Sequence, residues 1–504
     1  MFDQSVPEPS QLDGLSAAEL VDAARACARA ENAACARKLA VMAEIFVRRT
    51  RLPAADRENW WVDPDAAVSA ELAAAQHITS GLALHQTHRG VALRDRLPHV
   101  ADLFLRGLIS DTLVRIIVTR TYLITDPDLV AAVDADLAAE ITSWGPMSQK
   151  KTVTAIDALV ERHDPNGLRI TCDSAATRDV QFGSPTDAPG YTSVWARMLA
   201  SDAATAERVL TELVYSVCDD DPRTVTERRN DAYAALLAGI PALACRCGAG
   251  DCEAAARPRP RRDTTVYVIT DATTPPSAQA ADEPSPETVA APAPRSTKPF
   301  AACTRPAFVF GAGLTPAPLL GELVSDVEST HIRDIIHPGQ SGPEPRYTPS
   351  RALADFIRCR DLTCRFPWCD KPATSADIDH TVPYPVGPTH PSNLKCLCRF
   401  HHLLKTFWIG ALGWRDRQYP DGTIIWTSPT GHTYTTYPGS RLLFPALCRP
   451  TATLWVGDPP DIPLSDRRGT MMPRRRHTRA YNRARAIAAE RQRNEVAGDH
   501  PPPF

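Results

Sequence analysis

The sequence predicts an α+β fold, in which a multi-helix N-terminal domain precedes a small module rich in cysteine and histidine, an appended β-meander and a basic tail. Three observations support this prediction. Apolar residues recur at intervals of three and four from Leu15 to Gly239, which is the period of a helix. Cysteine and histidine occur in closely spaced pairs between positions 364 and 402. Beyond Trp414, short β-branched and aromatic runs alternate with Asp-Gly and Thr-Gly turn pairs.

The composition is that of a globular protein without a membrane-spanning segment. Charged residues make up 23% of the chain, and no uncharged apolar run reaches the roughly 18 residues that a bilayer requires. The segment from Met1 to Pro7 lacks the basic and apolar parts of a secretion signal. We therefore expect a cytoplasmic protein, in which the 14 cysteines act as metal ligands or buried thiols rather than in disulfides.

The N-terminal region, residues 1–240, carries repeated helix start signals. Ser16 precedes Glu19 by three residues, and Ser110 and Ser148 each precede an amphipathic run. A serine side chain at such a position accepts a hydrogen bond from a free N–H of the first turn. These signals predict several capped helices in one α-helical domain.

The connecting region, residues 241–345, is rich in cysteine and proline. Cys245, Cys247 and Cys252 lie around a glycine-rich turn and could supply three ligands of a second zinc knuckle, with Cys303 or His331 as the fourth; buried free thiols are the alternative.

Strand, linker and turn signals follow one another in the rest of this region. The β-branched run 265–270 predicts a strand, and the segment 271–300, with seven prolines and no glycine, predicts a disordered insertion because it cannot bury a core. Gly311 and Gly313 predict a turn before a short helix.

Two pairs of soft ligands in the module at 346–440 have the spacing of a structural zinc site. Cys364 with Cys369, and Cys398 with His401, would let one tetrahedral Zn²⁺ join two loops. The spacing alone also allows Cys359 or Cys396 as a ligand, although core packing is the usual role of an isolated thiol.

Polar residues between and beside these pairs suggest hydrolytic chemistry. Asp379 and His402 can hold a hard divalent cation through an oxygen and an imidazole nitrogen, and His380 is free to take a proton from water. His401 and His402 are consecutive at the start of a predicted helix, so their side chains point about 100° apart and can face different metals.

Residues Arg351 to Lys405 resemble the HNH (ββα-metal) endonucleases, because the ordered set His380, Asn393 and His402 stands among the zinc ligands. The resemblance implies that His380 is the general base, that Asn393 braces its loop, and that Cys398 rather than Cys396 binds zinc. It also implies a catalytic Mg²⁺ or Mn²⁺ and products with 5′-phosphate and 3′-hydroxyl ends.

The whole chain resembles the actinobacterial thirteen-E-twelve repeat family, through stretches such as Val217–Thr224 and Thr374–Pro385. Members combine an N-terminal helical domain of unknown function with an HNH module. We accordingly expect an HNH nuclease domain at 346–440 and a basic tail at 441–504.

The expected function is hydrolysis of double-stranded DNA by a metal-dependent endonuclease. Arg358 and Lys405 would contact phosphates near the site. The alternative is a catalytically silent, zinc-containing protein that binds nucleic acid or acts as a scaffold. In that case four polar residues would have no function, so their joint presence favours catalysis: Asp379, His380, Asn393 and His402.

The basic tail contrasts with a chain whose net charge is only −3. Ten arginines lie between Arg467 and Arg493, including the run Arg474, Arg475 and Arg476. This pattern predicts an arm that becomes helical on a polyanion and contacts phosphates without sequence preference.

Overall fold

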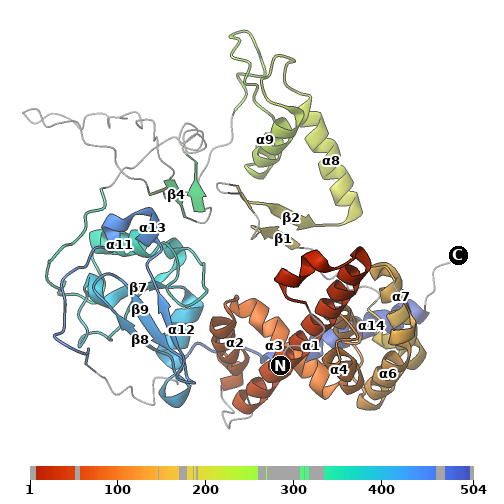
Figure 1. Ribbon diagram of the computed structural model, residues 1–504. Helices are drawn as coiled ribbons and strands as arrows, with labels where there is room; N and C mark the ends of the chain where they lie inside the picture. Colours follow the sequence, from red (N-terminus) through yellow and green to blue (C-terminus); the bar gives the residue numbers. More distant parts are fainter. Residues whose placement is uncertain are drawn as a thin grey trace, which may run out of the picture.

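The computed structural model is an α+β protein, as predicted, with helices in the N-terminal part and small antiparallel sheets after them (Figure 1). It describes residues 7–50, 57–145, 147–169, 179–184, 187–188, 191–258, 268–269, 307–310, 313–316, 334–460 and 471–499. No helix within these ranges is long and apolar enough to cross a membrane.

Seven helices surround the first core: α1 (Ala17–Thr50), α2 (Pro64–Gln76), α3 (Ser80–Asp95), α4 (Pro98–Leu105), α5 (Asp111–Arg120), α6 (Pro127–Glu140) and α7 (Gln149–His163). The expected caps are present, because Ser16 and Glu19 exchange hydrogen bonds at the start of α1, and Ser110 and Ser148 accept from the first turns of α5 and α7. Phe104, Ile117 and Ile156 are fully buried between these helices.

The helical region also contains a short hairpin that the helical period did not predict. Strand β1 (Asp179–Phe182) pairs antiparallel with β2 (Val194–Arg197), and every residue of both is exposed. Each strand has only four residues, too few to stand out from the surrounding helical pattern. Helices α8 (Ala200–Val214) and α9 (Val225–Leu237) follow and pack against each other.

The connecting region contains a three-stranded sheet. β3 (Val268–Ile269) agrees with the predicted strand and pairs with β4 (Ala307–Val309), which pairs with β5 (Gly313–Thr315). Gly313 therefore begins a strand, with φ +83°, and the predicted short helix and the insertion 271–300 lie outside the described residues.

The C-terminal module begins with α11 (Arg351–Asp361), whose N-cap Ser350 accepts a hydrogen bond from the Leu353 N–H. β6 (Asp377–His380) and β7 (Leu394–Leu397) form an antiparallel pair closed by α12 (Arg399–Phe407). The predicted meander follows as β8 (Arg415–Gln418), β9 (Ile424–Thr427) and β10 (Thr433–Thr436), and then α13 (Ser440–Leu443). Short 3-10 helices lie at Pro9–Gly14, Arg57–Asn59, Ile141–Ser143, Pro165–Gly167, Ala373–Ser375, Pro391–Asn393, Gly410–Leu412 and Pro445–Cys448.

Helix α2 shares a hydrophobic core with this module. Ala66, Ala70 and Ala74 on α2 are buried together with Trp408 after α12 and with Trp426 in β9. The indole of Trp408 donates a hydrogen bond to the Val62 carbonyl oxygen at 2.9 Å. Trp414, also in this core, is 5% exposed, so the tryptophans of the meander pack the sheet.

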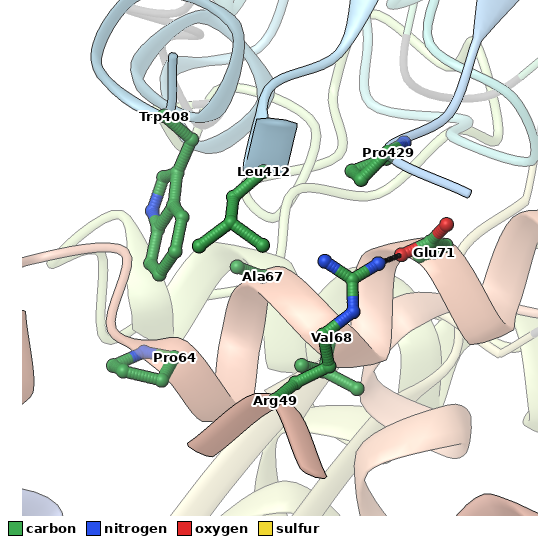
Figure 2. Close-up of a pocket in the computed structure, with 8 residues that line it drawn as sticks. All are labelled: Arg49, Pro64, Ala67, Val68, Glu71, Trp408, Leu412 and Pro429. Atoms are coloured by element: carbon green, nitrogen blue, oxygen red, sulfur yellow. Dashed lines mark hydrogen bonds and ion pairs between the residues drawn. The ribbon is translucent and has the colours of Figure 1, made fainter. Parts of the chain in front are cut away.

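A partly buried ion pair lies beside this contact. Figure 2 shows Trp408 and Leu412 above α2, next to the ion pair between Arg49 and Glu71 at 2.6 Å. The second oxygen of Glu71 accepts hydrogen bonds from Thr430, which follows β9. The two parts of the chain are therefore joined by both apolar and polar contacts.

The basic tail ends in α14 (Arg479–Asp499), which lies against the N-terminal helices in Figure 1. Arg491 forms an ion pair with Asp164 at 2.6 Å, and Arg475 forms one with Asp63 at 2.8 Å. The tail is thus helical through contacts within the chain, whereas the sequence predicted a helix formed only on a polyanion.

Candidate functional site

The four predicted zinc ligands lie together in the structure. The ligand atoms of Cys364, Cys369, Cys398 and His401 (the cysteine–histidine cluster) are all within 4.8 Å of one another. His401 Nδ1 lies 3.3 Å from Cys398 Sγ and 3.6 Å from Cys364 Sγ. Burial raises the pKa of the Cys364 thiol well above its usual value, so a bound cation would be needed to hold this sulfur as a thiolate. The cluster is consistent with structural zinc.

Local backbone structure explains why these four residues meet. Cys398 is the N-cap of α12, and His401 follows on its first turn. Cys364 and Cys369 flank a turn in which Trp368 has φ +59°.

The two alternative cysteines lie in another core. Cys359 and Cys396 are buried together with Phe356 and Leu394, and the Cys396 amide donates to Asp361 at 2.8 Å. Neither belongs to the cysteine–histidine cluster.

His380 is held in a defined tautomer by hydrogen bonds. Its Nε2 lies 3.0 Å from the Thr389 hydroxyl, which itself donates to the Arg346 carbonyl oxygen at 2.5 Å. Because the hydroxyl hydrogen is already used, Nε2–H must donate and Nδ1 keeps its lone pair.

Burial keeps the His380 ring neutral. The side chain of Tyr347 stacks on the ring with centroids 5.2 Å apart, and His380 is 7% exposed. Burial lowers the pKa of His380 to about 4, assisted by the charges of Lys395 and Lys405 and opposed by that of Asp379. The imidazole is therefore unprotonated and able to accept a proton at neutral pH.

Asn393 bridges the loop that carries Thr389. Its side-chain amide donates to the carbonyl oxygens of Val382 and Pro388 at 3.0 Å, and its Oδ1 accepts from the Val382 N–H at 2.8 Å. A Cβ added to Gly387 would lie 2.0 Å from the Val382 oxygen. Only glycine allows this close packing, so Gly387 and Asn393 together fix the loop beside His380.

Asp379 and His402 present an oxygen and a nitrogen to the same point. His402 Nε2 lies 3.6 Å from Asp379 Oδ1, while His402 Nδ1 lies 2.8 Å from Asp377 Oδ2. Asp377 and Asp379 are two residues apart on β6, so both carboxylates face α12. A carboxylate on Nδ1 fixes the tautomer that leaves Nε2 as a ligand, an arrangement typical of metal-binding histidines.

Two lysines lie beside Asp379: Lys405, which was expected near the site as a phosphate contact, and the buried Lys395, which was missed in the sequence. Lys395 Nζ lies 2.7 Å from both Asp379 Oδ2 and Asp416 Oδ2, and Lys405 Nζ lies 2.6 Å from Asp379 Oδ2. The Asp379 pKa is lowered because these lysine charges outweigh the effect of burial. One signal was present, since Lys395 interrupts the apolar strand Leu394–Leu397 directly opposite Asp379.

The predicted phosphate-binding residues are not brought together. Lys405 lies in the site, where it also donates to the His380 carbonyl oxygen at 2.7 Å, whereas Arg358 is half-buried on α11. Arg474 and Arg476 are exposed, and Arg475 is paired with Asp63. Their contact with nucleic acid stays a prediction.

A second cluster, made of four cysteines, corrects one expectation. The sulfurs of Cys218, Cys245, Cys247 and Cys252 (the four-cysteine cluster) lie within 4.8 Å of one another. The fourth thiol is therefore Cys218, which precedes Cys245 by 27 positions in the sequence. The residues that we had expected in its place, Cys303 and His331, lie outside the described residues.

Comparisons with known proteins identify the family. The family model described as "Domain of unknown function (DUF222)" matches residues 26–361. Two Mycobacterium tuberculosis proteins of strain H37Rv are each 46% identical to the chain: "Uncharacterized protein Rv2100" over 98% of this chain and 91% of its own length, and "Uncharacterized protein Rv3776" over 100% and 95%.

A third M. tuberculosis protein, "Uncharacterized protein in est 3'region", is 41% identical over 71% of this chain and all of its own length. No solved structure matches significantly. The extent of the family match and of these similarities shows that the chain belongs to the DUF222 family.

Proposed function

We propose that the protein is a metal-dependent HNH endonuclease that hydrolyses phosphodiester bonds in DNA. One observation carries the proposal. His380, which is neutral and held by Thr389, directly follows Asp379 in the chain. The Asp379 carboxylate on β6 faces the ring of His402. A structural zinc site needs only the cysteine–histidine cluster. It therefore does not explain this second set of polar residues, whereas catalysis does.

His380 would act as the general base. Thr389 holds the Nε2–H, and the Nδ1 lone pair takes a proton from the attacking water. Asn393 and Gly387 keep the loop that carries Thr389 in place, so they act as positioning residues for His380.

Asp379 and His402 fit a hard divalent cation. Asp379 Oδ2 is occupied by the two lysines, which leaves Oδ1 facing His402 Nε2 at 3.6 Å. A Mg²⁺ or Mn²⁺ ion bound there would stabilise the negative charge that develops on the phosphate and on the 3′-oxygen. The lysines keep Asp379 ionised, and the Nζ of Lys405, with an 11% exposed side chain, is the cation nearest to solvent in this set.

A silent binding protein is the second candidate, and two observations favour it. Lys395 and Lys405 already neutralise Asp379, and Tyr347 covers the His380 ring. If the lysines fully replaced a metal ion, the module would keep its fold and its zinc but lack hydrolytic activity.

Nicking of supercoiled plasmid by the purified full-length protein separates these candidates. The wild-type protein is assayed with Mg²⁺ or Mn²⁺ and with a chelator, beside His380→Ala and the matched variant His432→Ala. His432 is an exposed histidine of the same module, bonded to Thr430. We expect metal-dependent nicking by the wild type and by His432→Ala, and at least a 100-fold slower rate for His380→Ala, because general-base catalysis contributes about 10²- to 10⁴-fold.

The outcomes are distinct. Equal nicking by His380→Ala would remove the proposed base. No nicking by a folded, zinc-loaded wild-type protein with either metal would favour the silent binding protein.

A further inference from the structure

The helices α8 and α9 and the segment up to Arg257 form a unit of their own in Figure 1, outside the C-terminal module. This unit carries the four-cysteine cluster, which the proposed nuclease mechanism does not use. We propose that the four-cysteine cluster binds one Zn²⁺ ion, and that this ion folds the α8–α9 unit independently of the zinc at the cysteine–histidine cluster.

The sulfur positions fit a tetrahedral ion. Zn–S bonds of about 2.3 Å give a tetrahedron whose sulfurs are about 3.8 Å apart. In the four-cysteine cluster, all four sulfurs lie within 4.8 Å of one another, and Cys218 Sγ lies 3.3 Å from Cys245 Sγ. Two disulfides would join the four sulfurs only in separate pairs, whereas one soft cation holds all four around a single point, as their mutual distances require.

The backbone around the cluster is built to bring two distant segments together. Arg257 donates hydrogen bonds at 2.9 and 3.1 Å to the carbonyl oxygens of Ser216 and Leu243. These residues stand two positions before Cys218 and Cys245. Arg257 therefore aligns the two segments that supply the first two sulfurs.

A turn and a buried ion pair position the remaining ligands. Gly248, which follows Cys247, has φ +77°, a left-handed conformation that reverses the chain within the ligand loop. Asp221 accepts from Arg223 at 2.7 Å and from the Arg246 N–H at 3.0 Å, which fixes the loop between Cys245 and Cys247.

The unit has only a small apolar core. Only Leu213, Ala232 and Leu243 form its buried apolar cluster among the described residues, with four partly buried neighbours. Domains this small often need a metal or disulfides because their cores are insufficient. A structural zinc would supply the missing stabilisation, as in zinc knuckles that unfold without metal.

The test measures metals and local order in the full-length protein, purified under reducing conditions. We expect about two zinc ions per chain by elemental mass spectrometry, because each cluster offers one closed set of four ligands. Cys218→Ser and Cys364→Ser should each lose one. Cys27→Ser, which changes an exposed thiol outside both clusters, should lose none.

Hydrogen exchange locates the loss. Cys218→Ser should lose protection in peptides from 200–257 and keep it in 364–402, and Cys364→Ser should show the reverse. If Cys218→Ser is insoluble, Cys247→His offers a second test, because imidazole can replace a thiolate and should retain the zinc. Unchanged zinc content in a soluble Cys218→Ser, iron in place of zinc, or loss of zinc in Cys247→His would overturn the proposal. None of these outcomes depends on DNA cleavage.

Discussion

Replacing Lys395 with methionine tests the buried charge network beside Asp379. The Lys395 side chain is 0% exposed, and its ammonium group lies 2.7 Å from oxygens of Asp379 and Asp416. Methionine keeps the length and apolar volume but leaves two buried carboxylates short of one cation. Breaking a buried ion pair by removing one partner costs about 3–5 kcal/mol, so we expect a loss of unfolding free energy of that size at pH 7.5.

The pH dependence distinguishes lost charge from poor packing. In the wild type the Asp379 pKa is lowered, so its contribution to stability is present at neutral pH and is lost as the pH falls below the unfolded value. In Lys395→Met the Asp379 carboxylate, which would have lost one of its cations, would take up a proton more readily. The difference in unfolding free energy between variant and wild type should therefore shrink between pH 7.5 and pH 5.

Urea unfolding followed by tryptophan fluorescence is a suitable assay, because Trp414 and Trp426 are buried in the same module. Lys371→Met, which changes an exposed lysine, is the matched control. A destabilisation of less than about 1 kcal/mol, or one that is equal at both pH values, would refute the assignment of Lys395 as a required buried cation.

Three further predictions concern the loop, the base and the tail. Gly387→Ala should destabilise the loop beside His380 and slow cleavage, because the new Cβ would overlap the Val382 carbonyl at 2.0 Å; normal activity would contradict this. The His380 pKa of about 4 lies below the value near 6.5 expected in the unfolded chain. As the pH falls, the unfolded state therefore binds a proton before the folded state does. The free energy of unfolding should decrease by about 2–3 kcal/mol between pH 6.5 and pH 4. In His380→Gln this slope should be smaller, as chemical denaturation across that range would show. Arg491→Ala leaves the buried carboxylate of Asp164 without its cation and should increase hydrogen exchange in α14, whereas unchanged protection would mean that the tail is held elsewhere.

Local signals in the sequence were sufficient for most of the elements, though not for the hairpin of β1 and β2, and for part of the site. Serine caps, the helical period and the Asp-Gly and Thr-Gly turns act over a few residues, and the structure places α1, α5, α7 and the meander where they predict. The spacing of the ligands in the cysteine–histidine cluster is likewise local within each pair. The end of β7 and the start of α12 then bring the ligand atoms of the two pairs within 4.8 Å of one another.

Only the tertiary structure decided which distant residues meet. Cys218 joins Cys245 because the segment after α9 returns to the residues before that helix, where Arg223 donates to the Ala244 carbonyl oxygen, and no spacing within the sequence encodes that contact. Lys395 and Asp416 lie on different strands and form an ion pair. The alanines of α2 pack in one core with the tryptophans of the C-terminal module.

The basic tail illustrates the same division. Its arginines and helical spacing were evident in the sequence, but the acidic partners Asp63 and Asp164 lie hundreds of positions earlier in the chain. The sequence by itself determined the elements, the zinc-ligand pairs and the His, Asn and His set, because each depends on short-range geometry. The tertiary structure alone decided the charge network, the fourth cysteine and the place of the tail, because long-range packing selects those partners.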